Sequence, residues 1–454
     1  DFMLGRSFDT TARFVFPRAD DVYGPSDYAN QVPTVDSGDG YNALTRSPQV
    51  NKIYYNPAVT YTPWARSDGT LYANADPTCA LHNPERVGTG GDYCRNLTVN
   101  NTRYNGNGWV ACTSTSSCSN PTTTSKTFWP ATYFWHDGGD IWDWDNYTRV
   151  EIRSTTGSYT GHGRSGRTDC VSAAAETCTY AEELQNFANW YTYYRSRILA
   201  ARAGVGRAFA AQGEGMRVGF GAINKGSSTI DGISSTRTVI RGVRRFAGTD
   251  RDDFFDLLYQ HDVPFGGTPL RRALDAVGRY YERDDNRGPW SNTPGTTDAT
   301  PHVQCRQSYT VLMTDGYWSG RDSSNEADTS AARENVDNSE GPSISRPAGS
   351  DEKPSEYQYS PGNPFSDDDS NTLADVAMYY WKRDLRPNLD NEVPTNELDE
   401  AFWQHMVVFG VGLGVTGSVD PADAWAAVQD PTAVSITWPA TNPGQLNCSG
   451  ATCP

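Results

Sequence analysis

The sequence has few lysines and no long apolar run. Only five of its 38 basic residues are Lys, a bias that we attribute to codon usage more than to chemistry. No stretch approaches the roughly eighteen consecutive apolar residues that a membrane-spanning helix needs, so we expect no such span. The first six residues lack the basic start and apolar core of a secretory signal peptide. We therefore expect the chain to be a mature form or to begin within a longer protein.

Positive charge is also in deficit. The chain carries 38 Lys and Arg against 55 Asp and Glu, which gives a formal net charge of −17. A general nucleic-acid-binding protein needs a basic face to neutralise phosphates. We therefore exclude nucleic acid as a partner and expect a soluble protein that can attract cations.

The signatures of common catalytic sites are missing. The six histidines are dispersed, neither HExxH nor GxSxG occurs, and no Cys–His pairing is evident. The cysteines lack the CxxC spacing that is typical of zinc sites. We therefore expect a protein that is not an enzyme.

The nine cysteines are arranged mainly in close pairs. The segments between the paired cysteines are polar, which predicts disulfide-closed loops formed in an oxidising compartment. The predicted pairs are Cys79 with Cys94, Cys112 with Cys118, Cys170 with Cys178, and Cys448 with Cys453. Cys305 is left over, and two interpretations stay open: a buried free thiol, or a partner in a segment outside this sequence.

The first part of the chain, up to about residue 179, is irregular. It is rich in Asn, Thr, Ser, Gly, Tyr and Trp and shows no long helical period. Two aromatic stretches stand out, at residues 53–64 and 128–135. We favour packing of short strands and loops as their role, and a sugar-binding or surface-binding patch is the alternative.

The second part, about 179 to 431, alternates helical and strand patterns. Thr179 and Glu182 form a capping-box pattern, and the apolar stripe that follows predicts one long helix ending at Gly213. Alternation predicts an α/β fold, a doubly wound, mostly parallel sheet with helices on both faces. An acidic segment at 322–370 is expected to be a solvated loop. The other predicted strands are 216–223, 237–246, 406–411 and a buried run that starts at Ser308 and ends in Asp315-Gly316. The other predicted helices are 252–259, one that starts at 268–269, 373–381 and 422–428.

Two oxygen-bearing residues stand where a sheet of this kind binds ligands. Asp315 follows the apolar strand 308–313, and Thr268 lies in a Gly-Gly-Thr-Pro loop that opens a helix, with Pro269 at the first helical position. Hard cations such as Mg²⁺ prefer oxygen ligands, few of them charged. Thr268 and Asp315 are therefore candidate metal ligands. The alternatives are that Thr268 only caps the helix and that Asp315 only makes a turn.

Two weaker patterns suggest other sites. Four aspartates at 137, 140, 143 and 145 miss the EF-hand spacing, so a solvated turn is favoured over Ca²⁺ binding. The glycines of 410–414 lack GxGxxG spacing and are interpreted as strand glycines.

The helix-strand pattern resembles a known family. The GGTPLRRAL and TVLMTDG motifs, behind a long capped helix, look like a von Willebrand factor A domain and its metal-ion-dependent adhesion site. More closely, the chain resembles the N-terminal region of the type IV pilus tip adhesins of the PilC/PilY family, over almost all of 45–430. The segments that carry this resemblance are NKIYYNPAVTYTPW (51–64), the run DC…CTYAEELQNFANWYTYYRSRILAARAGVGRAFA (169–209), FGGTPLRRAL (265–274) and TVLMTDGYWSG (310–320).

The resemblance implies a domain organisation. Residues 1–179 would be a large family-specific, disulfide-containing insertion, 180–435 the von Willebrand factor A-like core, and 436–454 a Cys-containing tail. The tail would lead to the β-propeller that the family carries, beyond Pro454.

One departure from the family concerns the metal site. No Asp-x-Ser-x-Ser motif follows an apolar strand before Thr179, and 35–39 is the nearest match. In the family this motif would stand just before the place where the chain begins. Either upstream residues complete the site, which would hold Mg²⁺ or Ca²⁺, or the site is incomplete. The missing strand is central in such a sheet, so we expect a strand from outside residues 1–454 to fill its place.

The resemblance implies an extracellular, non-enzymatic adhesin region at the type IV pilus tip. Its partners would be minor pilins and a ligand on a host or abiotic surface. The alternative is a structural tip module that docks to minor pilins without a working metal site. Catalysis is the least favoured of the three hypotheses.

Overall fold

We describe the protein from a computed structural model. The structure describes residues 43–89, 93–103, 109–111, 127–263, 267–314, 318, 325–413 and 419–438. The chain is a mixed α/β protein that forms two compact units. Unit 1 comprises Asp1–Gly213 with Phe255–Val263, and unit 2 comprises Glu214–Phe254 with Pro264–Pro454. The boundaries at 179 and 435 that the family resemblance implies stay a prediction.

Short antiparallel strands dominate the first part of unit 1. Their pairs are β1 with β2, β3 with β4 and β5, β6 with β7, and β8 with β9. The strands are β1 (Ala80–Leu81), β2 (Cys94–Arg95), β3 (Asn101–Arg103), β4 (Trp109–Ala111), β5 (Thr127–Phe128), β6 (Thr132–His136), β7 (Tyr147–Glu151), β8 (Ser158–Thr160) and β9 (Thr177–Thr179).

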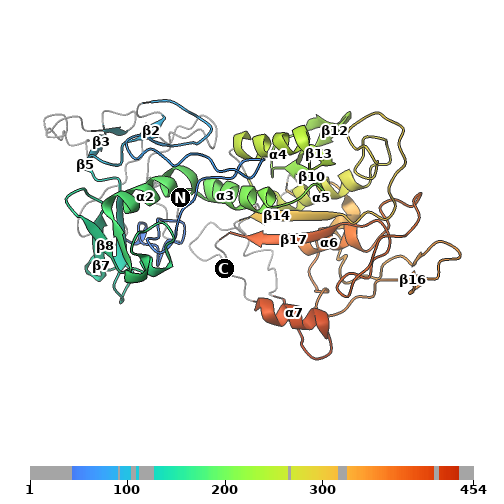
Figure 1. Cartoon of the computed structure of the whole chain (residues 1–454). Helices are drawn as coiled ribbons and strands as arrows, with labels where there is room; N and C mark the ends of the chain where they lie inside the picture. Colours follow the sequence, from blue (N-terminus) through green and yellow to red (C-terminus); the bar gives the residue numbers. More distant parts are fainter. Residues whose placement is uncertain are drawn as a thin grey trace. The chain divides into compact units, whose positions relative to one another are not determined.

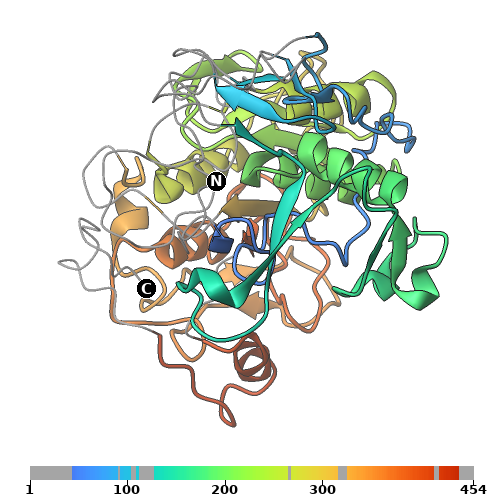
Figure 2. The same cartoon turned by 90° about the vertical axis from the view of Figure 1, so that its left-hand side faces the viewer.

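The long helix predicted after Thr179 is two helices. α2 (Tyr180–Tyr193) begins with the predicted capping box, in which Thr179 and Glu182 bond each other's backbone N–H groups. It ends at Tyr194, and α3 (Arg197–Ala210) starts afresh with the Ser196 hydroxyl accepting from the N–H of Leu199. Figures 1 and 2 show the two as consecutive green helices. The prediction of one helix was wrong because serine caps a new helix in spite of the continuing apolar stripe.

The two aromatic stretches of unit 1 are packed inside it, as favoured from the sequence. Tyr55 and Tyr133 are fully buried, and the Tyr55 ring lies 4.9 Å from that of Phe187 in α2. Trp64 stacks on Tyr259 at 4.5 Å between ring centroids and donates its indole N–H to the Tyr193 carbonyl. Aromatic packing therefore joins the irregular first part of the chain to α2.

Unit 2 contains the remaining elements. The boundary between the two units falls within α4. The helices are α4 (Gly248–Gln260), α5 (Leu270–Tyr281), α6 (Leu373–Trp381) and α7 (Pro421–Gln429). The strands are β10 (Arg217–Gly221), β11 (Ser228–Ile230), β12 (Ile233–Thr236), β13 (Val239–Arg245), β14 (Tyr309–Thr314), β15 (Ile344–Ser345), β16 (Glu356–Tyr357) and β17 (Val407–Gly412).

The strand predicted from residue 308 and the strand predicted at 406–411 do pair in parallel. The prediction that the first of them is buried was wrong, because Tyr309 is 47% and Val311 60% exposed. β14 and β17 run parallel and in register from Tyr309 opposite Val407 to Thr314 opposite Gly412, and they lie side by side in Figure 1. β10 and β13 pair antiparallel. Within the described ranges these strands form two separate pairs. The structure thus confirms an α/β organisation with a parallel pair, whereas the larger doubly wound sheet stays a prediction.

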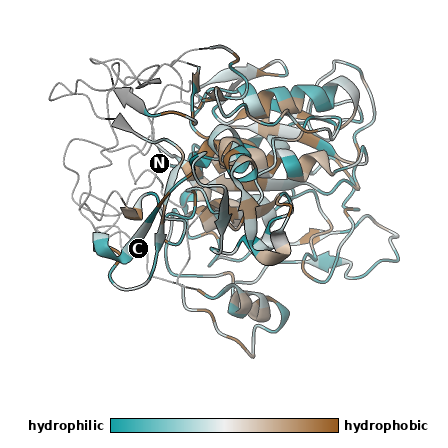
Figure 3. Cartoon of the chain, turned by 60° about the vertical axis from the view of Figure 1, so that its left-hand side comes forward, coloured by the Kyte–Doolittle hydropathy of each residue, from teal (hydrophilic) through white to brown (hydrophobic). Residues whose placement is uncertain are grey.

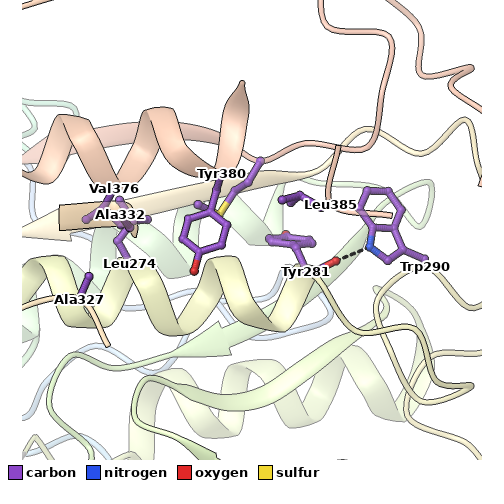
Figure 4. Close-up of a cluster of buried hydrophobic side chains, with 9 residues drawn as sticks. Leu274, Tyr281, Trp290, Ala327, Ala332, Val376, Tyr380 and Leu385 are labelled. Atoms are coloured by element: carbon purple, nitrogen blue, oxygen red, sulfur yellow. Dashed lines mark hydrogen bonds between the residues drawn. The ribbon is translucent and has the colours of Figure 1, made fainter. Parts of the chain in front are cut away.

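The core of unit 2 lies between α5, α6 and the parallel pair. Tyr380 and Val376 of α6 meet Leu274 of α5 there, and Trp290 donates its indole N–H to the Tyr281 carbonyl at 2.6 Å (Figure 4). Hydrophobic and hydrophilic residues alternate along the helices when the chain is coloured by hydropathy (Figure 3). This is the pattern of helices that bury one side.

The acidic segment 322–370 was expected to be a solvated loop. Among the residues that the structure describes, this holds for 351–356, which are exposed, but it was wrong for the first part of the segment. Ala327, Ala332 and Val336 of this segment are buried. The buried carboxylates of two helices hold its backbone: Asp275 of α5 accepts from the N–H of Asp328, and Asp375 of α6 accepts from that of Val336. The acidic, polar composition of the segment predicted a solvated loop. The helix carboxylates that bind its backbone could not be recognised, because they lie far from it in sequence.

Candidate functional site

Thr268 lies in the loop that leads into α5. The helix starts at Leu270, with Pro269 in the cap position, one residue later than the sequence predicted. The Thr268 carbonyl accepts from the N–H of Leu270 at 2.9 Å, and its side chain is half-buried. Asn224, in the loop after β10, donates from its amide to the Gly267 carbonyl at 2.9 Å. The loop is therefore held on two sides, by the helix that it opens and by the β10 loop.

The opposite end of α5 contacts β14. The Tyr281 hydroxyl, in the last turn of the helix, donates to the carbonyl of Tyr309, the first residue of β14, at 3.0 Å. Thr268 precedes the other end of the same helix. This is the arrangement expected if Thr268 lies towards the carboxyl end of β14, which Asp315 follows. Asp315 itself is outside the described residues.

The part of the chain that the structure describes shows no cluster of strong metal ligands. Among the described residues, no three or more His, Cys, Asp or Glu side chains are grouped so that they could hold a metal ion. The aspartates of 137–145 form a turn, as favoured from the sequence: Asp140 accepts from the N–H of Trp142, and Asp143 from that of Asp145. Gly410 and Gly412 are strand residues of β17, also as expected.

Two of the four predicted disulfides lie in described parts of the chain, and both are present. Cys79 pairs with Cys94, and Cys170 pairs with Cys178. The other two predicted pairs, Cys112 with Cys118 and Cys448 with Cys453, lie outside the described residues. Cys305 is a free, exposed cysteine, so the interpretation as a buried thiol was wrong, whereas a partner outside this sequence stays a prediction.

The sequence analysis missed the side chains that share a cavity with the Thr268 loop. Asn224, Arg237 and Thr238 line a cavity of about 230 Å³ together with Gly267 and Arg272. These residues come from three separate segments and form no recognisable motif. The one local signal was the turn after β10, where Asn224 has a positive φ of 64°. Asparagine tolerates this left-handed conformation better than most residues do.

Comparison with known proteins links the chain to pilus biogenesis. It is 34% identical over 309 residues to the type IV pilus biogenesis factor PilY1 of Pseudomonas aeruginosa strain PAK, which is 64% of this chain and 22% of that protein. It is 32% identical over 315 residues to PilY1 of strain PAO1, covering 64% of this chain and 25% of that protein. PilY1 of strain UCBPP-PA14 is 31% identical over 300 residues.

The chain thus spans about a quarter of the length of the curated relatives that it matches. No family model matches the sequence. No solved structure matches either. Among the described helices, none has both the length and the apolar character needed to cross a membrane. The likeness to PilY1 supports the pilus-related resemblance that the motifs indicated.

Proposed function

We propose that this chain is an extracellular region of a type IV pilus tip adhesin, which mediates surface attachment and contributes to pilus assembly. The observation that carries the proposal is the similarity to three PilY1 proteins, each named a type IV pilus biogenesis factor. The disulfides Cys79–Cys94 and Cys170–Cys178 fit an oxidising compartment such as the cell exterior. In this role the chain binds rather than catalyses, with minor pilins and a surface ligand as its partners.

A metal-dependent adhesion site is the finer part of the proposal. The Thr268 hydroxyl and the Asp315 carboxylate would serve as oxygen ligands of Mg²⁺ or Ca²⁺, the chemistry that such ions prefer. Thr268 fits this role because it is half-buried on a loop anchored by Asn224 and α5. A bound cation would attract an acidic group of the surface ligand.

The sheet that carries this site is proposed to be of the von Willebrand factor A type, completed by a strand from outside residues 1–454. Within the described ranges, β14 pairs with β17 alone and β10 pairs with β13 alone. Each strand of the parallel pair therefore has one edge without a strand partner among the described residues. One face of the pair is also exposed and apolar, with Val311 60% and Phe409 53% exposed. Open strand edges invite strand addition.

A surface-attachment assay distinguishes a metal-dependent adhesin from a purely structural tip module. In a piliated bacterium whose own copy is deleted, we expect Thr268→Val and Asp315→Asn to abolish most surface attachment while leaving the number of surface pili unchanged. Thr268→Ser, which keeps the hydroxyl, should attach like the wild type. Normal attachment by both Thr268→Val and Asp315→Asn would refute the metal-site proposal. Loss of pili together with attachment would instead favour the structural module.

A further inference from the structure

A cationic cavity lies beside the Thr268 loop in unit 2. Its volume is about 230 Å³, room for one group of the size of an amino acid or a single sugar. Its wall includes three segments: the first turn of α5, the turn after β10 and the start of β13. The lining residues are Asn224, Gly226, Arg237, Thr238, Gly267, Pro269, Arg272, Ala273 and Asn325, and none of them is acidic.

Arg237 brings an uncompensated positive charge to this cavity. Its side chain is exposed, and no carboxylate of the described residues forms an ion pair with it. Arg272, across the cavity, is only 13% exposed and lies 2.9 Å from Asp328. Arg279 also approaches that carboxylate at 2.8 Å, but Asp275 lies 3.1 Å from Arg279, so two carboxylates balance these two arginines. The positive charge without an ion-pair partner among the described residues is therefore that of Arg237, in a chain of net charge −17.

Thr238 supplies a hydroxyl that the fold leaves without a partner. The residue is 7% exposed, its Oγ1 is buried, and no group of the described residues hydrogen-bonds to it. Its backbone is engaged, since the Thr238 carbonyl accepts from the N–H of Ala222 at 3.0 Å. A buried hydroxyl without a partner is unfavourable, so its retention on a cavity wall indicates a ligand that accepts its proton.

The start of α5 strengthens the preference for a negative ligand. The helix has 12 residues, and its first turn contributes Pro269, Arg272 and Ala273 to the cavity wall. The aligned peptide dipoles of a helix place partial positive charge at its N-terminus, which favours anions. The helix end, two guanidinium groups and one hydroxyl donor thus converge on the same small space.

We propose that this cavity binds a carboxylate-bearing group of a surface ligand. Guanidinium groups match the planar, two-oxygen geometry of a carboxylate, and Thr238 can donate a further hydrogen bond. The inference gives a ligand class to the proposed adhesin, but the binding itself involves neither Asp315 nor a metal ion. It can therefore be tested separately from the metal site.

The test is calorimetry on the full chain in buffer that contains a metal chelator. The probes are glucuronate, an acidic sugar, and N-acetyl-aspartate, an acidic amino acid, each compared with its neutral analogue, glucose or N-acetyl-asparagine. We expect at least one acidic probe to bind and neither neutral analogue to do so. Which acidic probe binds more tightly tells whether a sugar acid or an acidic peptide is the source. Binding of inorganic phosphate without either carboxylate would overturn the proposal.

Three variants localise the binding. Arg237→Gln should weaken binding about tenfold or more, because it removes a charged donor from an exposed position. Thr238→Val should also weaken binding while leaving the melting temperature unchanged or raised, because it removes a hydroxyl that has no partner in the fold. Arg245→Gln is the matched control: its side chain is 69% exposed at the far end of β13. Unchanged affinity in both cavity variants would overturn the proposal, and so would an equal loss in the control.

Discussion

Glu183 shows how a single side chain can organise the inside of unit 1. The carboxylate is fully buried in α2 and bonds Arg164 at 2.6 Å and Arg167 at 3.1 Å, both of which are buried too. Tyr55, from the first aromatic stretch, donates its hydroxyl to the same carboxylate at 2.9 Å. Tyr55 lies more than a hundred residues before the two arginines in the sequence, so this one carboxylate joins two separate parts of the irregular region to α2.

Removing this carboxylate should be costly. We expect Glu183→Ala to lower the free energy of unfolding by about 3–5 kcal/mol, because two buried guanidinium groups lose their counter-charge. Glu182→Ala, one residue earlier, should cost about 1 kcal/mol, since it removes half of a helix cap and an exposed hydrogen bond from the N–H of Val171. Denaturant unfolding followed by tryptophan fluorescence measures both. Equal losses in the two variants would show that the buried ion network adds nothing beyond the cap.

Asp337 should make the stability of unit 2 depend on pH. Burial raises the pKa of its carboxyl to about 7, and the nearby Asp375 and Asp367 carboxylates add to the effect. An unfolded Asp titrates at about 3.9. Between these values the folded chain holds one more proton than the unfolded chain, so the stabilising contribution is full below about pH 4 and is lost as the pH rises through about 7.

We expect Asp337→Asn to flatten this dependence. The variant should be more stable than the wild type at pH 8, and its unfolding free energy should fall less between pH 5 and pH 8. Its amide oxygen can still accept from the N–H of Asp367, as the acid does at 3.4 Å. Denaturant unfolding at four pH values provides the measurement, with Asp351→Asn, an exposed site in the same segment, as control. Parallel curves for the wild type and Asp337→Asn would contradict the assignment.

At the scale of elements, the contact between α5 and α6 depends on a glycine. A Cβ at Gly278 of α5 would lie 2.4 Å from ring atoms of Tyr380 in α6. The ring is fully buried and its hydroxyl donates to Asp275 at 2.7 Å, so it has little room to move. Close helix packing here therefore requires the absence of a side chain.

Two helical glycines should respond to alanine in opposite ways. Gly278→Ala should destabilise unit 2 by about 1–3 kcal/mol through overpacking. Gly204→Ala in α3 should stabilise unit 1 by about 0.5–1 kcal/mol, because nothing lies within 4 Å of the added carbon and alanine favours the helix. Denaturant midpoints, with hydrogen exchange to assign each change to its unit, test this pair. Stabilisation by Gly278→Ala would show that the two helices are not in close contact.

At the scale of the whole molecule, the two described disulfides both belong to unit 1. Cys170 and Cys178 close a loop of eight residues in sequence, and Cys178 lies in β9, directly before α2. The link therefore restrains the chain at the point where the irregular part leads into the helices.

Removal of this disulfide should weaken unit 1 selectively. The double substitution Cys170→Ser and Cys178→Ser should lower the stability of unit 1 by about 2–3 kcal/mol through greater freedom of the unfolded chain. Amide exchange should then accelerate in α2 and stay unchanged in α5. Equal acceleration in both helices would mean that the two units unfold as one.

The sequence by itself determined the local elements. α6 has the predicted bounds, α2 has the predicted capping box, and β14 and β17 lie where apolar runs placed them. Two disulfides followed from cysteine spacing, and the start of α5 was predicted to within one residue. These features depend on residues within a few positions of one another, so the information needed to predict them is local.

Tertiary structure decided the burial of part of the acidic segment and the cavity of Arg237 and Thr238. Each depends on partners that are distant in the chain: α5 and α6 carboxylates hold the acidic segment, and residues 224, 237 and 272 meet only after folding. Sequence composition alone predicts that such polar side chains are solvated, because it carries no information about their neighbours in the folded protein. Burial and charge pairing are set by three-dimensional neighbours, and these neighbours exist only in the folded chain.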